Sequence, residues 1–340
     1  MHPCRIFLHS YDISFALLSK STSYFGNNPR RCFEASVSVK ALGWKKKNLE
    51  SDIERVAGAG SGFIRGMINQ MPYPVDAFNL SHSIFQILPT DGDPSLSSCK
   101  FDAVSRWALD NFMGKFDKHN AEARTSFYNV VSSSTAGAPL QGRLFEIQVL
   151  NYLDGIKGDY EFTLRRLAGS GKIPWLYRGP IPRFSFKKST LTAGIANAVQ
   201  RKVPVHLVPI SPNQAAVDSI LYDPKEPDTL TCIQIMKNKS HPIAVSGLKL
   251  IQEQLKRGTP LARLRPSKAN PWRFIFIVPS LDMESTFNLQ DFNEDTLLHE
   301  WASKVQQYVV KLEEHIIFGK EPDRTQLATT SQTREQQVRC

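Results

Sequence analysis

Hydrophobic and polar positions follow regular spacings in the second half of the chain, beginning near residue 140. Apolar residues recur every three or four positions, as on one face of a helix, in the segments 140–155, 191–201, 246–258 and 296–314. Short apolar or alternating runs, which are typical of strands, occupy 160–168, 203–210 and 272–280. Helices and strands that succeed one another in this way predict an α/β domain with a mixed central sheet flanked by helices.

The chain before residue 139 predicts a mainly helical N-terminal region. The segment 80–91 alternates like a strand, and a helical stripe follows at Val104, Trp107, Ala108, Phe112 and Phe116. A Ser- and Gly-rich stretch at 132–140 would act as a hinge. We therefore divide the chain into 1–78, a helical connecting region at 79–138, the α/β domain at 139–318 and a tail at 319–340. The tail has too few apolar residues to bury and is expected to be disordered.

Charge and cysteine content narrow the class of protein. The net charge of +10 suits a nucleic-acid partner, because Lys and Arg gain affinity by displacing counterions from phosphates. The five cysteines are scattered and show no C-x-x-C spacing, which argues against a disulfide framework and against a zinc site. No apolar run approaches the roughly twenty residues that span a bilayer. Because the N-terminus also lacks a signal-peptide pattern, we expect no membrane contact and an intracellular location, in the cytoplasm or nucleus.

Two predicted strands joined by a turn carry the candidate chemistry, in the sequence AAVDSILYDPKEPDTLTCIQIMKNKSHPI at 215–243. Asp218 lies on the first strand and Gln234 on the second. Oxygen ligands on adjacent strands suit Mg²⁺, which can orient a water and neutralise charge on a scissile phosphate. Glu146, on a predicted helix, could add a third oxygen. Each residue also has an ordinary explanation, as a turn Asp, a hydrogen-bonded strand Gln and a solvent-facing helix Glu.

The order of a helix Glu, a strand Asp and a following strand with Gln in the acidic position resembles the PD-(D/E)xK, or restriction-endonuclease-like, superfamily. More narrowly, GRLFE, VDSILYDP and IQIMKNKSHPI followed by GL resemble the C-terminal nuclease domain of Crinkler and retrotransposon-hot-spot (RHS) type proteins, many of them fungal. The resemblance implies metal-dependent nuclease activity, with Glu146, Asp218 and Gln234 as catalytic and metal-binding residues. It also implies that a secreted, effector-type role in a host cell is an alternative location.

In this family a P-loop NTPase module precedes the nuclease domain. The sequence YFGNNPRRCF at 24–33 resembles the end of that module, so 1–78 would be its remnant. The phosphate loop itself is absent, because the glycines at 58–62 follow a predicted helix and no Lys-Ser/Thr comes after them. The resemblance covers most of residues 20–315.

The usual catalytic lysine of the superfamily is replaced by Met236, whose thioether cannot stabilise a developing negative charge. Strand alternation sends Lys237 and Lys239 to the opposite face from Gln234 unless a bulge re-aims them. Lys249, on the next predicted helix, could supply the cation instead. His241 is a further candidate for a polar role near the site, or else a loop residue that caps the strand end.

A basic and aromatic stretch at 174–189 is the candidate nucleic-acid contact. Its cations could track phosphates while its aromatic rings stack on bases. The cations are Arg178, Arg183, Lys187 and Lys188, and the aromatic residues are Trp175, Tyr177, Phe184 and Phe186. The alternative is a loop whose rings anchor it to the core and whose cations are solvated. A second basic run, LKRGTPLARLRPSKANPWR at 255–273, could add two or three phosphate contacts.

Three hypotheses follow from the sequence. The first is a nuclease-like domain that binds DNA or RNA and cleaves weakly with Mg²⁺, in which Met236→Lys would restore cleavage. The second is a catalytically degenerate module that binds nucleic acid or protein without enzymatic activity. The third is an interaction protein whose basic charge is incidental.

Overall fold

The computed structural model describes residues 14–26, 28–59, 83–89, 99–119, 121–132, 137–210, 216–293 and 298–318. The predicted disordered tail, the middle of the predicted hinge and the glycines at 60–62 lie outside these residues. The described residues form two compact units, one ending at Leu144 and joined by Phe318, the other running from Phe145 to Ile317. The division into an NTPase remnant and a connecting region stays a prediction.

Helices dominate the first unit. Its elements are α1 (Phe15–Phe25), α2 (Pro29–Ser36), α3 (Val39–Gly58), β1 (Phe85–Pro89), β2 (Cys99–Ala103), α6 (Arg106–His119) and α7 (Ala121–Ser132). The side chain of Asn28 accepts a hydrogen bond from the Arg31 N–H and so caps α2, and Ser38 caps α3 in the same way. The strands β1 and β2 pair antiparallel. The sequence predicted the helical stripe along α6 and the strand β1, but neither α1 nor β2.

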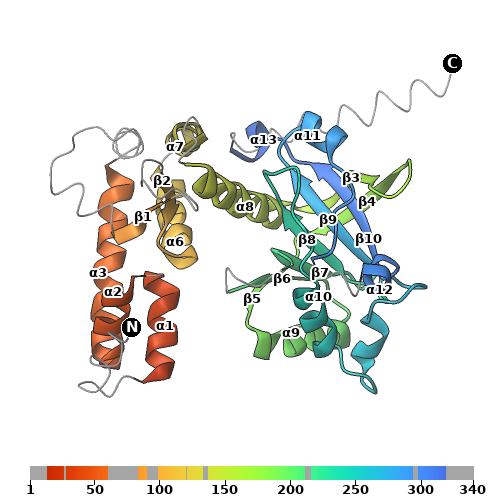
Figure 1. The fold of residues 1–340 in the computed structure, drawn as a ribbon, viewed down its shortest axis with the longest axis horizontal. Coiled ribbons are helices and arrows are strands. Elements are labelled where there is room, and N and C mark those ends of the chain that lie inside the picture. The colour runs from red at the N-terminus through yellow and green to blue at the C-terminus, as the bar shows by residue number, and fades with distance from the viewer. Residues whose placement is uncertain are drawn as a thin grey trace. The chain divides into compact units, whose positions relative to one another are not determined.

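An eight-stranded mixed sheet forms the centre of the second unit, in the order β4-β3-β10-β9-β8-β7-β6-β5 (Figure 1). The strands are β3 (Gly158–Arg166), β4 (Lys172–Gly179), β5 (Arg183–Phe186), β6 (Val205–Pro209), β7 (Ser219–Tyr222), β8 (Thr231–Ile235), β9 (Trp272–Val278) and β10 (Val305–Lys311). The β8–β9, β9–β10 and β5–β6 pairs are parallel and the others are antiparallel. The predicted α/β fold with a mixed sheet is confirmed.

The sheet is strongly curled. Its two edge strands, β4 and β5, are joined by residues 180–182 alone. Eight strands in a flat sheet would span seven gaps, or roughly 34 Å, whereas the four Cα–Cα steps between Gly179 and Arg183 reach at most about 14 Å. The edges must therefore approach each other.

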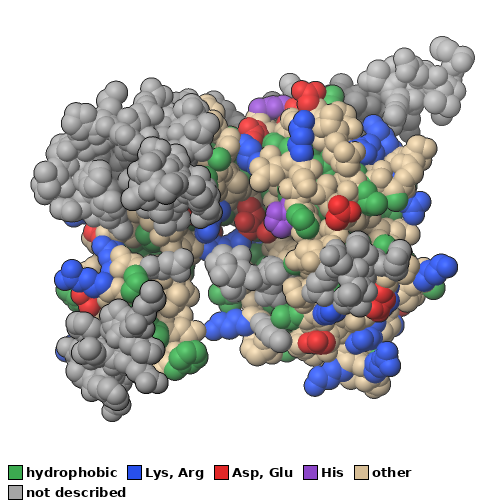
Figure 2. Space-filling model, in the orientation of Figure 1, with side chains coloured by type: hydrophobic (Ala, Val, Ile, Leu, Met, Phe, Trp, Pro, Cys, Tyr) green, Lys and Arg blue, Asp and Glu red, His purple; other side chains and the backbone are tan. Residues whose placement is uncertain are grey.

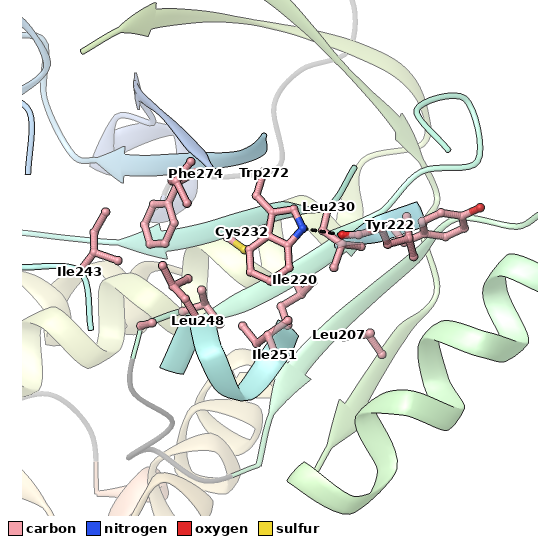
Figure 3. Packing of buried hydrophobic residues seen from close by; sticks show 14 of the residues in the cluster. Leu207, Ile220, Tyr222, Leu230, Cys232, Ile243, Leu248, Ile251, Trp272 and Phe274 are labelled. Atoms are coloured by element: carbon pink, nitrogen blue, oxygen red, sulfur yellow. Dashed lines mark hydrogen bonds between the residues drawn. The ribbon is translucent and has the colours of Figure 1, made fainter. Parts of the chain in front are cut away.

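Helices cover both faces of the sheet. On one face lie α9 (Lys188–Arg201), α10 (Val245–Gln254) and the short 3₁₀ helix η2 (Pro260–Leu264), which share a hydrophobic core with alternate strand residues. Figure 3 shows part of this core, including Ile220, Cys232, Leu248 and Phe274, and the Trp272 indole N–H donates to the Leu264 carbonyl oxygen (2.7 Å). The other face carries α8 (Ala138–Gly155). The remaining helices of the described residues are short: α11 (Leu281–Thr286), α12 (Leu298–Ala302) and α13 (Glu314–Phe318).

Two sequence-based expectations about secondary structure are wrong. The segment 296–314 is not one helix, because α12 ends at Ala302 and β10 follows from Val305 in the middle of the sheet. The stretch 174–189 is not a loop, because it contains most of β4, all of β5 and the start of α9. Both errors bear on the candidate site, as described below.

Candidate functional site

Asp218 and Gln234 meet where the β7–β8 ladder ends. The last paired residues are Ser219 and Ile233, and Asp218 continues the pairing partly through its side chain. Its backbone N–H donates to the Ile233 carbonyl oxygen (2.9 Å), and its Oδ2 accepts from the Ile235 N–H (2.6 Å). The carboxylate therefore lies against the β8 backbone immediately beside Gln234. The structure thus brings together these two residues that the sequence singled out.

The side chain of Gln234 is buried, with 7% of its surface exposed. Its Nε2 lies 3.1 Å from His241 Nδ1, whereas its buried Oε1 has no hydrogen-bond partner among the described residues. A buried polar atom without a partner costs about 1–3 kcal/mol, so such atoms usually mark a missing water, ion or ligand. An unpartnered amide oxygen, and a carboxylate held against the backbone of the same strand, are suitable ligands for a cation.

A chain of buried amides holds the His241 turn in place. The His241 N–H donates to Gln290 Oε1 (2.7 Å), and Gln290 Nε2 donates to the Asn288 carbonyl oxygen (2.7 Å). Gln290 and Gln307 of β10 are bonded reciprocally, from Gln290 N–H to Gln307 Oε1 (2.9 Å) and from Gln307 Nε2 to the Gln290 carbonyl oxygen (2.8 Å). Sequence reasoning missed both glutamines. Gln307 could have been noticed in the sequence, because a buried Gln among the apolar residues of VQQYVV is unusual for a strand buried on both faces.

Met236 and Lys237 point to opposite faces, as strand alternation predicts. Met236 is part of the α9–α10 core, and its N–H donates to the Ile277 carbonyl oxygen (2.9 Å). Lys237 Nζ bonds Glu314 Oε1 (2.5 Å) and lies 6.0 Å from the centre of the Phe145 ring. Burial lowers the pKa of Lys237, and the Glu314 carboxylate acts in the opposite direction. Lys237 is thus engaged on the α8 face.

Glu146 and Lys249 complete the predicted site. Glu146 is half-buried on α8, next to Phe145, on the other face of the sheet from α10. Lys249 lies on α10. The pKa of Glu300 in α12 is lowered, mainly by its hydrogen bond to Lys304 and to a smaller extent by the positive charge of Lys249. The convergence of Glu146 and Lys249 on the Asp218–Gln234 pair stays a prediction.

The protein ligands available at this pair are few and consist of oxygen. In the part of the chain that the structure describes, no group of three or more His, Cys, Asp or Glu side chains could hold a metal ion. Zinc and the softer metals, which take three or four such ligands, therefore do not suit it. Mg²⁺ keeps several waters and is commonly bound through one or two carboxylates together with substrate phosphates. Asp218 and the Gln234 amide oxygen fit that pattern.

Most of the aromatic side chains in the stretch 174–189 are buried. Trp175, Tyr177 and Phe186 are buried, and only Phe184 is exposed, at 54%. The Phe162 and Trp175 rings stack across β3 and β4 with centroids 5.2 Å apart. Three of the four aromatic residues are therefore anchors of the core, as the alternative interpretation expected of the rings, although the stretch itself is not a loop.

Two of the four predicted nucleic-acid cations in this stretch form ion pairs. Arg178 on β4 pairs with Asp223, which follows β7, and Arg183 on β5 pairs with Asp154 at the end of α8 (2.7 Å). Lys187 is exposed and precedes α9, and the structure describes the backbone but not the side chain of Lys188. Arg178 and Arg183 thus link elements of the curled sheet.

A second polar cluster lies inside the unit, between α8 and the sheet, and has the residue types of a catalytic triad. Ser219 Oγ is 2.8 Å from His206 Nε2, and His206 Nδ1 is 3.5 Å from Asp154 Oδ1. Burial raises the pKa of the nearby Tyr177 phenol, and the Asp154 carboxylate adds to this effect. His206 and Ser219 are both 0% exposed. A nucleophile must reach its substrate, so we interpret this chain of groups as structural.

We predict that Ser219→Ala destabilises the fold by about 1–2 kcal/mol, because His206 Nε2 loses its buried partner. Urea unfolding measures this change. A fluorophosphonate reagent is expected not to label Ser219 in the folded protein. Stoichiometric labelling that Ser219→Ala removes would contradict the structural interpretation and make this cluster an active site.

No described helix is long and apolar enough to cross a membrane. The chain matches no protein-family model, no curated protein and no solved structure.

Proposed function

We propose that the second unit is a restriction-endonuclease-like domain of the Crinkler/RHS type, with a weak Mg²⁺-dependent phosphodiesterase site at Asp218 and Gln234. The observation that carries this proposal is the buried Gln234 Oε1, which has no hydrogen-bond donor among the described residues, on the same strand whose Ile235 N–H donates to Asp218 Oδ2. A divalent cation would give that oxygen a partner. The order of Glu146, Asp218 and Gln234 along the chain supports the same assignment.

Each residue has a role that its position allows. Asp218 and Gln234 would hold the cation, and Glu146 would complete its coordination if α8 presents it to this end of the sheet. The cation supplies charge neutralisation at the scissile phosphate and a polarised water. The His241 turn, fixed by Gln290 and Gln307, orients the Gln234 amide. Asp218 already accepts a hydrogen bond from the Ile235 N–H, so its carboxylate is held in place before a cation binds.

Low activity follows from the residues around the pair. Met236 faces the hydrophobic core and Lys237 pairs with Glu314, so neither presents a cation to the Asp218–Gln234 pair. Loss of one electrostatic stabiliser typically costs about 10²- to 10³-fold in rate. Gln234 also brings no negative charge, which weakens binding of a divalent cation relative to a carboxylate.

The proposal is tested by Mn²⁺ binding, followed by electron paramagnetic resonance, together with cleavage of DNA and RNA in Mg²⁺. We predict that Asp218→Asn lowers Mn²⁺ affinity at least about tenfold and abolishes any cleavage, because it removes the one formal charge of the ligand pair. Asp228→Asn is the matched control, since Asp228 is an exposed carboxylate in the β7–β8 connection. Equal Mn²⁺ binding by both variants would contradict the proposed site.

The burial of Met236 favours a second candidate, a catalytically degenerate domain that binds nucleic acid without cleaving it. This candidate predicts salt-sensitive binding by the wild-type chain, no cleavage in any metal and no effect of Asp218→Asn. Binding of neither DNA nor RNA would leave the third hypothesis, an interaction protein with incidental basic charge.

A further inference from the structure

One group of exposed cations of the second unit lies around η2 and the C-terminal ends of α9 and α10. The segments 196–204 and 255–272 contain seven Lys and Arg and no Asp or Glu. One of them, Arg265, donates to the carbonyl oxygens of Gln252 (2.7 Å) and Leu255 (2.9 Å) and so closes the end of α10. The other six are exposed and form what we call the η2 surface: Arg201, Lys202, Lys256, Arg257, Arg263 and Lys268.

The cations of the η2 surface differ from those of β4 and β5 in their partners. Arg178 and Arg183 are held by Asp223 and Asp154, whereas none of the six forms an ion pair with a described carboxylate. In Figure 2, Lys and Arg side chains gather along the part of the second unit that carries α9, α10 and the chain around η2. Positive charge that no internal carboxylate neutralises is available to an anionic partner.

The backbone at 255–271, which carries four of these cations, is anchored, although η2 is the one helix in it. Leu255, Leu261 and Leu264 belong to the hydrophobic core, and the Trp272 indole bonds the Leu264 carbonyl oxygen. Thr259 caps η2, and α9 packs directly against it. The cations therefore project from a fixed framework, so that little conformational entropy of the backbone is lost when a partner binds.

We propose that the η2 surface binds the phosphodiester backbone of a nucleic acid. Evenly exposed cations with few apolar neighbours suit a polymer of fixed phosphates. A lipid surface would instead need exposed apolar side chains among the cations, and the one large hydrophobic residue exposed in these two segments is Val203, at 37%. The exposed cations and the scarcity of exposed apolar side chains therefore favour nucleic acid as the partner of the η2 surface.

The η2 surface and the Asp218–Gln234 pair lie at opposite ends of the sheet. Helix α9 leaves the end of β5 and returns to the start of β6, and α10 leaves the end of β8, so both helices end away from Gln234. The 14 residues of α9 alone measure roughly 20 Å. Binding here is therefore independent of the metal site, and it is the same whether or not the proposed phosphodiesterase activity exists.

The test measures binding of a 20-base-pair DNA duplex and a single-stranded RNA of equal length by fluorescence anisotropy, in EDTA, over a range of salt concentrations. The variant combines Lys256→Gln, Arg263→Gln and Lys268→Gln. Its matched control combines Lys157→Gln, Lys172→Gln and Lys225→Gln, which removes the same charge from exposed lysines elsewhere on the second unit. We predict that the η2 variant loses affinity on the order of 10²-fold at 0.1 M salt, and that its salt slope falls by about 3.

The control is expected to bind within about threefold of the wild type, because its lysines make no localised phosphate contact. Equal losses in the two variants would reduce the effect to net charge and overturn the proposal. Failure of the wild type to bind either polymer would overturn it as well. If vesicles containing phosphatidylserine bind the wild type more tightly than nucleic acid, and the η2 variant loses that binding, the partner is a lipid surface and the commitment to nucleic acid is wrong.

Discussion

Met236→Lys is expected to destabilise the fold by about 3–5 kcal/mol, which is typical of a buried charge without a partner. Met236 is 5% exposed and belongs to the core between the sheet and α10, together with Cys232 and Leu248. A lysine stem at this position leads into that core. The structure therefore changes the expectation from sequence, in which the same substitution restores a catalytic cation and raises cleavage.

Urea unfolding of Met236→Lys and of the control Met236→Leu separates these outcomes. The leucine variant should lose less than about 1.5 kcal/mol, because it conserves apolar volume. A buried lysine has a folded pKa below its unfolded value, so the unfolded state binds more protons and stability rises with pH between the two values. The difference between the variants should accordingly narrow as the pH approaches about 10. A fully stable Met236→Lys that also cleaves faster would show that the ammonium reaches Asp218, and would restore the original expectation.

The sequence predicted the β7–β8 hairpin and which of its side chains share a face. It could do so because the second strand carries both polar and apolar residues, so that their alternation is visible in the sequence. The sequence did not predict β10, which lies in the segment 296–314 that was expected to be one helix. Because β10 is buried on both faces of the sheet, VQQYVV shows no alternation of polar and apolar residues that would mark it as a strand. The prediction failed again at β4, which lies largely in the basic and aromatic stretch that was expected to be a loop and which contains Pro174. Proline is tolerated there because β4 is an edge strand.

In the candidate site, too, some residues could be predicted from the sequence and others could not. Asp218 and Gln234 could be predicted because they are close in sequence and one hairpin determines their relation. Gln290 contacts the His241 turn across 49 residues and Gln307 across 17 residues, and these relations depend on the tertiary fold. The ion pairs of Arg178 and Arg183 could not be predicted from the stretch 174–189, because their carboxylate partners come from elements distant in sequence.

Gln234→Glu is expected to make the stability of the second unit depend strongly on divalent metal. The substitution adds a second carboxylate to the strand that contacts Asp218, in a position where Oε1 has no donor among the described residues. Without metal, two neighbouring carboxylates repel each other and the buried charge lacks a partner, so the unfolding free energy should fall by roughly 1–3 kcal/mol. With Mn²⁺ or Mg²⁺, the added charge should raise metal affinity at least about tenfold. Binding to the folded state then returns the lost stability.

Thermal unfolding in EDTA and in a series of Mn²⁺ concentrations measures this linkage without requiring any cleavage. Gln307→Glu is the matched control, since Gln307 is also a buried strand glutamine but donates to the Gln290 carbonyl oxygen. This variant should be destabilised because that donor is lost, and metal should not rescue it. If the proposed phosphodiesterase is correct, Gln234→Glu should also cleave DNA or RNA faster than the wild type, and Asp218→Asn should remove the gain. Rescue of both variants to the same extent, or of neither, would exclude a metal site at Asp218 and Gln234, because only a cation bound between those two side chains distinguishes position 234 from position 307.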